Sequence, residues 1–152
     1  MAGETTLFSK IICGEIPCCE VAKGASWLAF LDINPRRPGH TLVVPHEAKM
    51  HLAELSPRQL SELWQGVVET QGILSSHFKT DDFSIGIHDG PISGQEVPHV
   101  HIHLIPRSQG DGGLSLLACW PDSPPPGTTE PDFIALNELA CALREMGEEN
   151  GG

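Results

Sequence analysis

Positive charge is scarce in this sequence. Its 152 residues include nine Lys and Arg against twenty Asp and Glu, which gives a formal net charge of -11 with histidine neutral. The Lys and Arg residues form no cluster, so the phosphate backbone of a nucleic acid would be repelled rather than held. A small anionic ligand would need local compensation from imidazoles, backbone N–H groups and Arg107. The composition therefore argues against a nucleic-acid partner.

Long apolar runs and paired cysteines are also missing. No stretch approaches about 18 consecutive apolar residues, and the amino terminus has no charged head followed by a long apolar run. Neither a membrane helix nor a secretion signal is predicted. The five cysteines are odd in number and include no Cys-x-x-Cys pair, which favours reduced thiols over a disulfide framework. We expect a soluble cytoplasmic protein, with the nucleus as an alternative location.

The most informative stretch runs from residue 94 to residue 107. Three histidines alternate there with three aliphatic residues, in the order His99, Val100, His101, Ile102, His103 and Leu104. A period of two with β-branched residues in the gaps is typical of a β-strand. The segment is therefore predicted to be a strand with imidazoles on one face and aliphatic side chains in the core.

Such a row of histidines has three interpretations. A purely structural row is disfavoured, because histidine is less readily buried than an aliphatic residue. A metal held by all three is awkward: at roughly 3.3 Å per residue, the Cα atoms of His99 and His103 lie about 13 Å apart, although neighbours in the row could chelate together. The third interpretation is a polar track for a phosphate chain, in which a neutral imidazole acts as a nucleophile. We favour the third.

With its flanks, this segment resembles the signature of the histidine triad (HIT) superfamily. Residues 99–105 match the pattern His-φ-His-φ-His-φ-φ, in which φ is a hydrophobic residue. The similarity covers about residues 7–111, and its other matching blocks are 14–17, 29–35, 38–40, 89–91, 94–95 and 105–107. Several blocks are similar to fragile histidine triad proteins and related microbial members. The resemblance implies an α+β fold, with a five-stranded antiparallel sheet, a long packed helix and short terminal helices, in subunits that pair as homodimers.

The resemblance also implies a chemistry. It implies an enzyme that cleaves at the α-phosphorus of an adenosine-type nucleotide, either a nucleoside phosphoramidate or a dinucleoside polyphosphate, through a covalent nucleotidyl-histidine. His101 matches the nucleophile and His103 the residue near the scissile bridging atom, while His99 and His40 orient the row. The implied nucleotide-binding residues are Phe8, Ile11, Phe30, Asp32, Ile33, His88, Gly94, Gln95, Glu96 and Val97.

The sequence departs from family patterns at three positions. Zinc-binding members carry Cys-x-x-Cys where this chain has Thr6 and Ser9, so we expect no metal and no cofactor. Relatives commonly carry Asn or Gln where it has His88. From local sequence alone, Asp32 is a turn former before Asn-Pro.

Two other classes of function stay open: a metal-dependent hydrolase using two imidazoles, and a nucleotide-binding scaffold with vestigial catalysis.

Local patterns place the elements along the chain. Helical spacing of apolar residues predicts a short helix over 7–13, a long helix that begins after the Ser56 cap, and a final helix near the carboxyl end. Short apolar runs predict strands over 19–23, 27–32, 40–45 and 83–88.

Gly94 and its neighbours could form a nest of N–H groups for an anion. His46, His51 and His77 are interpreted as exposed bystanders. Residues 1–115 are assigned to the HIT-like domain and 116–152 to a proline-rich linker and helical tail.

Overall fold

The chain forms two compact units. The computed structural model describes residues 5–151, and their contacts group into Met1–Gly113 and Leu114–Gly152. The division into independent domains at residue 115 stays a prediction. The histidine segment lies in the first unit, which therefore contains the candidate site.

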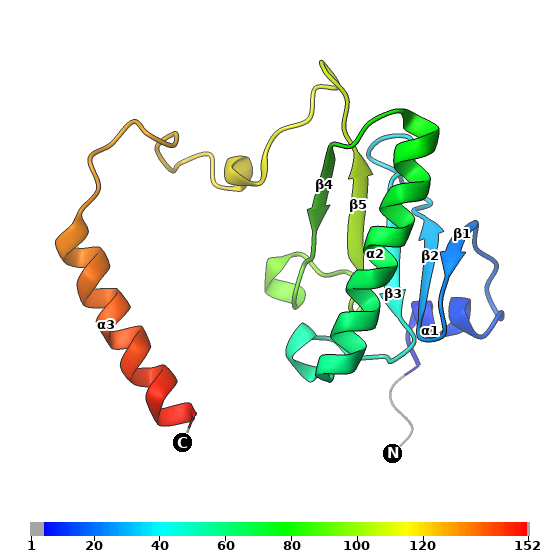
Figure 1. Ribbon diagram of the computed structural model, residues 1–152, viewed down its shortest axis with the longest axis horizontal. Helices are drawn as coiled ribbons and strands as arrows, with labels where there is room; N and C mark the ends of the chain where they lie inside the picture. The colour runs from blue at the N-terminus through cyan, green and yellow to red at the C-terminus, as the bar shows by residue number, and fades with distance from the viewer. Residues whose placement is uncertain (1–4, 152) are drawn as a thin grey trace. The chain divides into compact units, whose positions relative to one another are not determined.

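The first unit is built on one sheet of five strands (Figure 1). The strands are β1 (Glu20–Lys23), β2 (Trp27–Leu31), β3 (Thr41–Pro45), β4 (Phe83–Gly86) and β5 (Ile102–Pro106), in the spatial order β1-β2-β3-β5-β4. Every neighbouring pair is antiparallel, which confirms the predicted α+β architecture. Strand β5 lies between β3 and β4, so the histidine segment leads into the interior of the sheet.

The long helix α2 (Pro57–Phe78) covers one face of the sheet (Figure 1). It begins as predicted: the Ser56 side chain accepts the Gln59 N–H, and Pro57 takes the first helical position, where no N–H is needed. The core on this side consists of Trp27, Ala29, Val43, Leu55, Leu63, Val67, Leu74, Val100, Ile102 and Leu104. Burial of these side chains fixes α2 against the sheet.

Two glycines inside α2 have different environments. A Cβ built at Gly66 would overlap the indole ring of Trp27, whereas a Cβ at Gly72 would meet nothing within 4 Å. Gly66 therefore lets the helix approach the sheet closely. Gly72 carries only the usual cost of glycine in a helix.

The short helix α1 (Leu7–Ile12) lies on the opposite face of the sheet. It begins at a capping box formed by Thr6 and Ser9, and Gly14, with φ +84°, follows its carboxyl end as predicted. Its buried Phe8 packs with Leu28, Phe30, Leu42 and Val44. Side chains alternate along a strand, so these residues point away from the α2 side. Leu42 is the register partner of His103, which therefore also emerges on the α1 face.

Among residues 5–151 the remaining elements are three turns of 3-10 helix and the final helix. The turns are η1 (Leu52–Glu54), η2 (Pro91–Ser93) and η3 (Leu116–Cys119). In the second unit, Asp132 caps α3 (Phe133–Asn150), and the apolar side chains of α3 are more than half exposed at Phe133, Leu136, Leu139 and Leu143. Within residues 5–151 no helix is both long and apolar enough to cross a membrane.

Candidate active site

The histidine segment is a strand only in its second half. Strand β5 begins at Ile102, so His99 and His101 precede the paired residues and only His103 lies within the strand. The prediction of one continuous strand is therefore wrong for residues 99–101. The predicted alternation of side chains does hold for the aliphatic residues of the row. These residues are fully buried against α2: Val100, Ile102 and Leu104.

The strand cannot continue because of the residues that face it. Pro45 ends β3 and has no N–H to donate to a ladder. Its carbonyl accepts instead from the His99 ring at 2.8 Å. The Val100 N–H turns away and donates to the carbonyl of Lys49 at 2.7 Å. The chain before β5 is thus extended but tied by side chains and by the loop after β3.

His101 is held by a backbone carbonyl. Its Nδ1 lies 2.7 Å from the carbonyl oxygen of His99. Because a carbonyl only accepts, the neutral ring carries its proton on Nδ1, and Nε2 keeps a lone pair. Burial lowers the pKa of the His101 imidazole, which is 6% exposed, so the ring is neutral near pH 7. The site thus contains a neutral imidazole with its tautomer fixed.

His99 is fully buried and bonded at both ring nitrogens. Nε2 donates to the Pro45 carbonyl, which fixes the proton on that nitrogen. Nδ1 is therefore an acceptor, and the hydroxyl of Thr6 donates to it at 2.7 Å. Burial lowers the pKa of the His99 imidazole. Both nitrogens are engaged, so His99 can contact a ligand only through its backbone or ring face.

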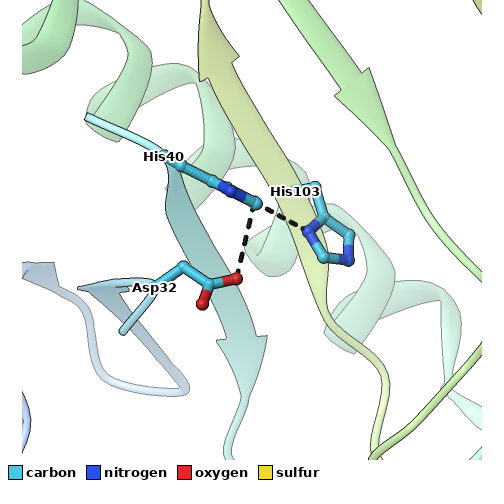
Figure 2. A group of neighbouring side chains, drawn as sticks. All are labelled: Asp32, His40 and His103. Atoms are coloured by element: carbon cyan, nitrogen blue, oxygen red, sulfur yellow. Dashed lines mark hydrogen bonds and ion pairs between the residues drawn. The ribbon is translucent and has the colours of Figure 1, made fainter. Parts of the chain in front are cut away.

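His40 lies beside His103 (Figure 2). Its Nδ1 accepts the backbone N–H of Arg36 at 3.2 Å, so its proton is on Nε2, which donates to Nδ1 of His103 at 2.9 Å. Asp32 Oδ2 lies 3.6 Å from the same Nε2. Burial lowers the pKa of the His40 imidazole, and the carboxylate of Asp32 partly opposes this. The contact of His40 is with His103, the third histidine of the row, and its predicted role in orienting the row together with His99 stays a prediction.

The outer nitrogen of His103 points into the site. Since Nδ1 accepts from His40, the proton of the neutral ring is on Nε2. This Nε2 is buried and has no hydrogen-bond partner among residues 5–151. Burial, followed by the nearby His101, His40 and His88, lowers the pKa of the His103 imidazole to about 4. An unsatisfied buried N–H beside the lone pair of His101 indicates a place for an acceptor atom of a ligand.

Asp32, His40 and His103 come close enough to suggest a metal site. One donor atom from each lies within 4.8 Å of the others. To bind a metal through Nε2, His40 would need its proton on Nδ1, which faces the N–H of Arg36. Two N–H groups would then oppose each other at 3.2 Å. The donor set does not fit a metal ion in this arrangement, and the expectation of no metal stays a prediction.

Three predicted pocket residues gather beside the histidines. The Phe8 ring meets the His101 ring edge-on, with centroids 5.0 Å apart, and lies 5.7 Å from His99 and 5.6 Å from Phe30. Ile11 packs in the same apolar cluster. This apolar wall adjoins the imidazole row, and its predicted role in holding a base stays a prediction.

The segment after β2 contains two more predicted contacts. Asp32 Oδ1 accepts the Asn34 N–H at 2.8 Å, which is the turn-forming bond expected from sequence alone. Its other oxygen faces His40. Ile33 is 88% exposed. Their predicted roles in nucleotide binding stay predictions.

The backbone between β4 and the histidines only partly matches the predicted nest. The N–H groups of Gly94 and Gln95 donate to carbonyls of the same loop at 3.1 and 3.3 Å, so they are used within the turn. The N–H groups of Glu96 and Val97 have no acceptor among the described residues. Gly94 has φ +106°, which favours glycine. The predicted anion nest is therefore wrong for the first two N–H groups, and the next two are the candidates.

Side chains of this loop border the site. His88 is exposed, and its ring centroid lies 5.5 Å from that of His103. The side-chain amide of Gln95 is buried and donates to the Met50 carbonyl at 2.8 Å. Because its NH₂ group has this partner, Gln95 anchors the loop. Its predicted contact with phosphate is not tested by this bond.

Arg107 does not offer its charge to the site. Its guanidinium contacts the Asp111 carboxylate at 2.7 and 2.9 Å and Ser84 Oγ at 2.9 Å. The guanidinium holds the pKa of Asp111 well below its usual range. The compensation for an anionic ligand that the sequence suggested from Arg107 is therefore directed at Asp111.

The other histidines are only partly as predicted. His46 and His77 are exposed, but His51 is half-buried, with Nδ1 3.6 Å from Asp89 Oδ1. Sequence reasoning missed Thr6 as the partner of His99. The Thr6-x-x-Ser9 cap was readable, but nothing in it indicates a histidine 93 positions away.

Known proteins resemble this chain throughout the part that holds the site. The HIT domain family model matches residues 13–110, and the chain belongs to the HIT family. A relative in Schizosaccharomyces pombe, named adenosine 5′-monophosphoramidase hnt1, is 38% identical over 120 residues, which are 78% of this chain and 84% of that protein. The bis(5′-nucleosyl)-tetraphosphatase of the same yeast is 42% identical over 83 residues, which are 55% of this chain and 46% of that protein.

A solved structure shares the fold. The histidine triad nucleotide-binding protein from Candida albicans has a TM-score of 0.79 and 30% sequence identity, over 95% of this chain and 98% of that one. The predicted membership and fold are confirmed.

Proposed function

We propose that this protein is a nucleotide hydrolase that transfers the nucleotidyl group of an adenosine-type nucleotide first to His101 and then to water. The main support for the proposal is that the ring protons of two neighbouring histidines, His101 and His103, have fixed positions. The bond from His101 Nδ1 to the His99 carbonyl leaves the Nε2 lone pair for attack, and His103 holds an N–H beside it. The two ring centroids are 5.0 Å apart.

The reaction proceeds in two displacements. His101 Nε2 forms a bond to the α-phosphorus, the bond from phosphorus to the leaving group breaks, and the leaving group takes a proton from His103, which has gained one from solvent on substrate binding. Water then attacks the same phosphorus and gives its proton to the now neutral His103. The bond from phosphorus to His101 Nε2 breaks, which releases nucleoside monophosphate and restores His101. Two such steps replace one harder displacement.

Phosphate binding is coupled to the charge of His103. With a pKa of about 4 in the ligand-free protein, His103 is neutral at pH 7. A bound phosphate places negative charge near this ring and raises its pKa. The proton thus becomes available when the substrate is in place. The N–H groups of Glu96 and Val97, which shortly precede the histidine row in the sequence, are the backbone donors proposed to stabilise the negative charge that develops on the phosphate.

The proposed substrate class is the adenosine 5′-phosphoramidates, including lysyl conjugates, with slower cleavage of diadenosine polyphosphates. An amine leaves poorly unless it is protonated, and His103 is the group placed to supply that proton. The monophosphoramidase relative supports this choice, since the match covers 84% of it, whereas the match to the tetraphosphatase covers 46%. Phe8, Ile11 and Phe30 would hold the base, with Asp32 and Ile33 at the ribose.

We further propose that the subunits form a homodimer and act in the cytoplasm or the nucleus. The thiol state supports an intracellular location, because none of the five cysteines, all within residues 5–151, is paired in a disulfide. Light scattering after size-exclusion chromatography tests the dimer. A monomeric mass at micromolar concentration would contradict it.

Kinetics of His101→Ala test the function. Turnover of adenosine 5′-phosphoramidate should be lost, while the dissociation constant for adenosine monophosphate stays within about tenfold, because the base contacts lie elsewhere. The control is His77→Ala, at an exposed histidine on α2. Substantial turnover in His101→Ala contradicts the proposal. Nucleotide binding by a wild-type protein that has no turnover would favour a binding scaffold instead.

A further inference from the structure

We propose that Thr6 is a positioning residue for this reaction: its hydroxyl donates to Nδ1 of His99 and thereby fixes the backbone carbonyl that holds the nucleophile His101. The inference deepens the proposed function and rests on it. Thr6 is 7% exposed and reaches His99 across 93 positions of sequence.

The direction of the hydrogen bond follows from its neighbours. The Pro45 carbonyl obliges His99 to carry its proton on Nε2, so Nδ1 can only accept. Thr6 Oγ1 already accepts the N–H of Ser9 at 3.0 Å and lies 2.9 Å from the Ser9 hydroxyl. The Ser9 hydroxyl accepts the Thr6 N–H at 3.3 Å. Because His99 Nδ1 can only accept, the Thr6 hydroxyl gives its single proton to His99, which leaves the Ser9 hydroxyl as the donor to Thr6 Oγ1.

The tether acts on the nucleophile through one residue. His99 is held at one ring nitrogen by Thr6 and at the other by Pro45, both in a fully buried position. The carbonyl of His99 accepts the Nδ1 proton of His101 at 2.7 Å. Because the same residue provides ring and carbonyl, a ring fixed at both ends fixes the carbonyl that sets the tautomer and orientation of His101.

Thr6 also links the row to the apolar wall. Its hydroxyl caps α1, and the Phe8 ring of that helix lies 5.0 Å from the ring of His101. The Thr6 side chain thus caps α1, the helix that carries Phe8, and also anchors His99. A second capping box, at Ser56, begins α2 through bonds to Gln59, so a variant there shows how the loss of a helix cap away from the row affects turnover.

The kinetic test compares three variants. Thr6→Val keeps the β-branch and removes the hydroxyl, and it should lower kcat about tenfold while KM changes less than about threefold, because the nucleophile is misplaced while the pocket remains. Thr6→Ser restores the donor and should recover kcat to within about threefold. Ser56→Ala removes a helix cap elsewhere and should keep the wild-type kcat. Equal kcat in Thr6→Val and Ser56→Ala would overturn the proposal.

A spectroscopic test needs no variant. In long-range ¹H–¹⁵N spectra of the wild-type protein, His99 should show a protonated Nε2 and an unprotonated Nδ1, with the Nδ1 shift moved by an accepted hydrogen bond. A proton on Nδ1 of His99 would overturn the inference even if Thr6→Val does not fold. If the wild-type protein has no turnover, the proposed function fails, and these spectra still decide the bond between Thr6 and His99.

Discussion

The neutral histidines of the site should make the first unit sensitive to acid. His103 has a pKa of about 4 in the folded protein, against about 6.5 for an unperturbed histidine. The unfolded chain therefore binds the proton more tightly. The stability from keeping this ring neutral is complete above pH 6.5 and is lost as the pH falls from about 6.5 to about 4.

The size of the effect follows from the two pKa values. Integrated between pH 7.5 and pH 5, the difference in proton binding lowers the free energy of unfolding by about 2 kcal/mol, and the full loss below pH 4 is about 3 kcal/mol. Burial lowers the pKa of His40, His99 and His101 as well, so their titration adds in the same direction. A variant at His103 is needed to isolate its share.

His103→Asn provides that variant, because its amide oxygen can still accept from His40 but does not titrate. Guanidinium unfolding, followed by tryptophan fluorescence, to which the buried Trp27 contributes, gives the free energy at pH 7.5 and at pH 5. Between these values the variant should lose about 2 kcal/mol less than the wild type. His77→Asn, at an exposed histidine, should lose as much as the wild type. The reasoning is refuted if His103→Asn is as acid-sensitive as His77→Asn.

Three other predictions follow from single contacts. Gly66→Ala should lower the free energy of unfolding by about 1–3 kcal/mol, because its Cβ would overlap Trp27, whereas Gly72→Ala should raise it by about 0.5–1 kcal/mol; equal effects would contradict this packing. His103→Ala should lower kcat/KM for adenosine 5′-phosphoramidate more than for diadenosine triphosphate, and an equal loss would show that the proton donor is misassigned. A chelator should change kcat/KM on the phosphoramidate by less than about twofold, because His40 presents an N–H to the cluster; stoichiometric metal lost together with activity would contradict this.

Local signals in the sequence were enough to predict most of the helices and strands. The Ser56 cap, the Gly14 terminus and the alternation of Val100, Ile102 and Leu104 each depend on neighbours in the chain, and each was found as predicted. The extent of the last strand was not predictable in this way. It depends on Pro45, more than fifty residues earlier, whose missing N–H ends the ladder.

In the candidate site, too, features set by neighbours in the chain were predictable and features set by distant residues were not. The pattern of the row indicates which histidines matter, but not which nitrogen of each ring carries the proton. That is decided by groups distant in sequence or invisible in it: the carbonyls of Pro45 and His99, the N–H of Arg36 and the hydroxyl of Thr6. A backbone donor or acceptor has no residue-type signal, so only the fold reveals it.

The proposed mechanism depends on a covalent bond between His101 Nε2 and the α-phosphorus. Wild-type protein mixed with adenosine 5′-phosphoramidate and quenched within milliseconds in alkaline denaturant, where a phosphorus–nitrogen bond survives, can be digested and analysed by mass spectrometry. We expect an adenylyl group on the peptide that contains His101, localised to that residue by fragmentation and absent from His101→Ala. An adenylyl group on any other residue, or steady turnover with no adduct at any quench time, would contradict it.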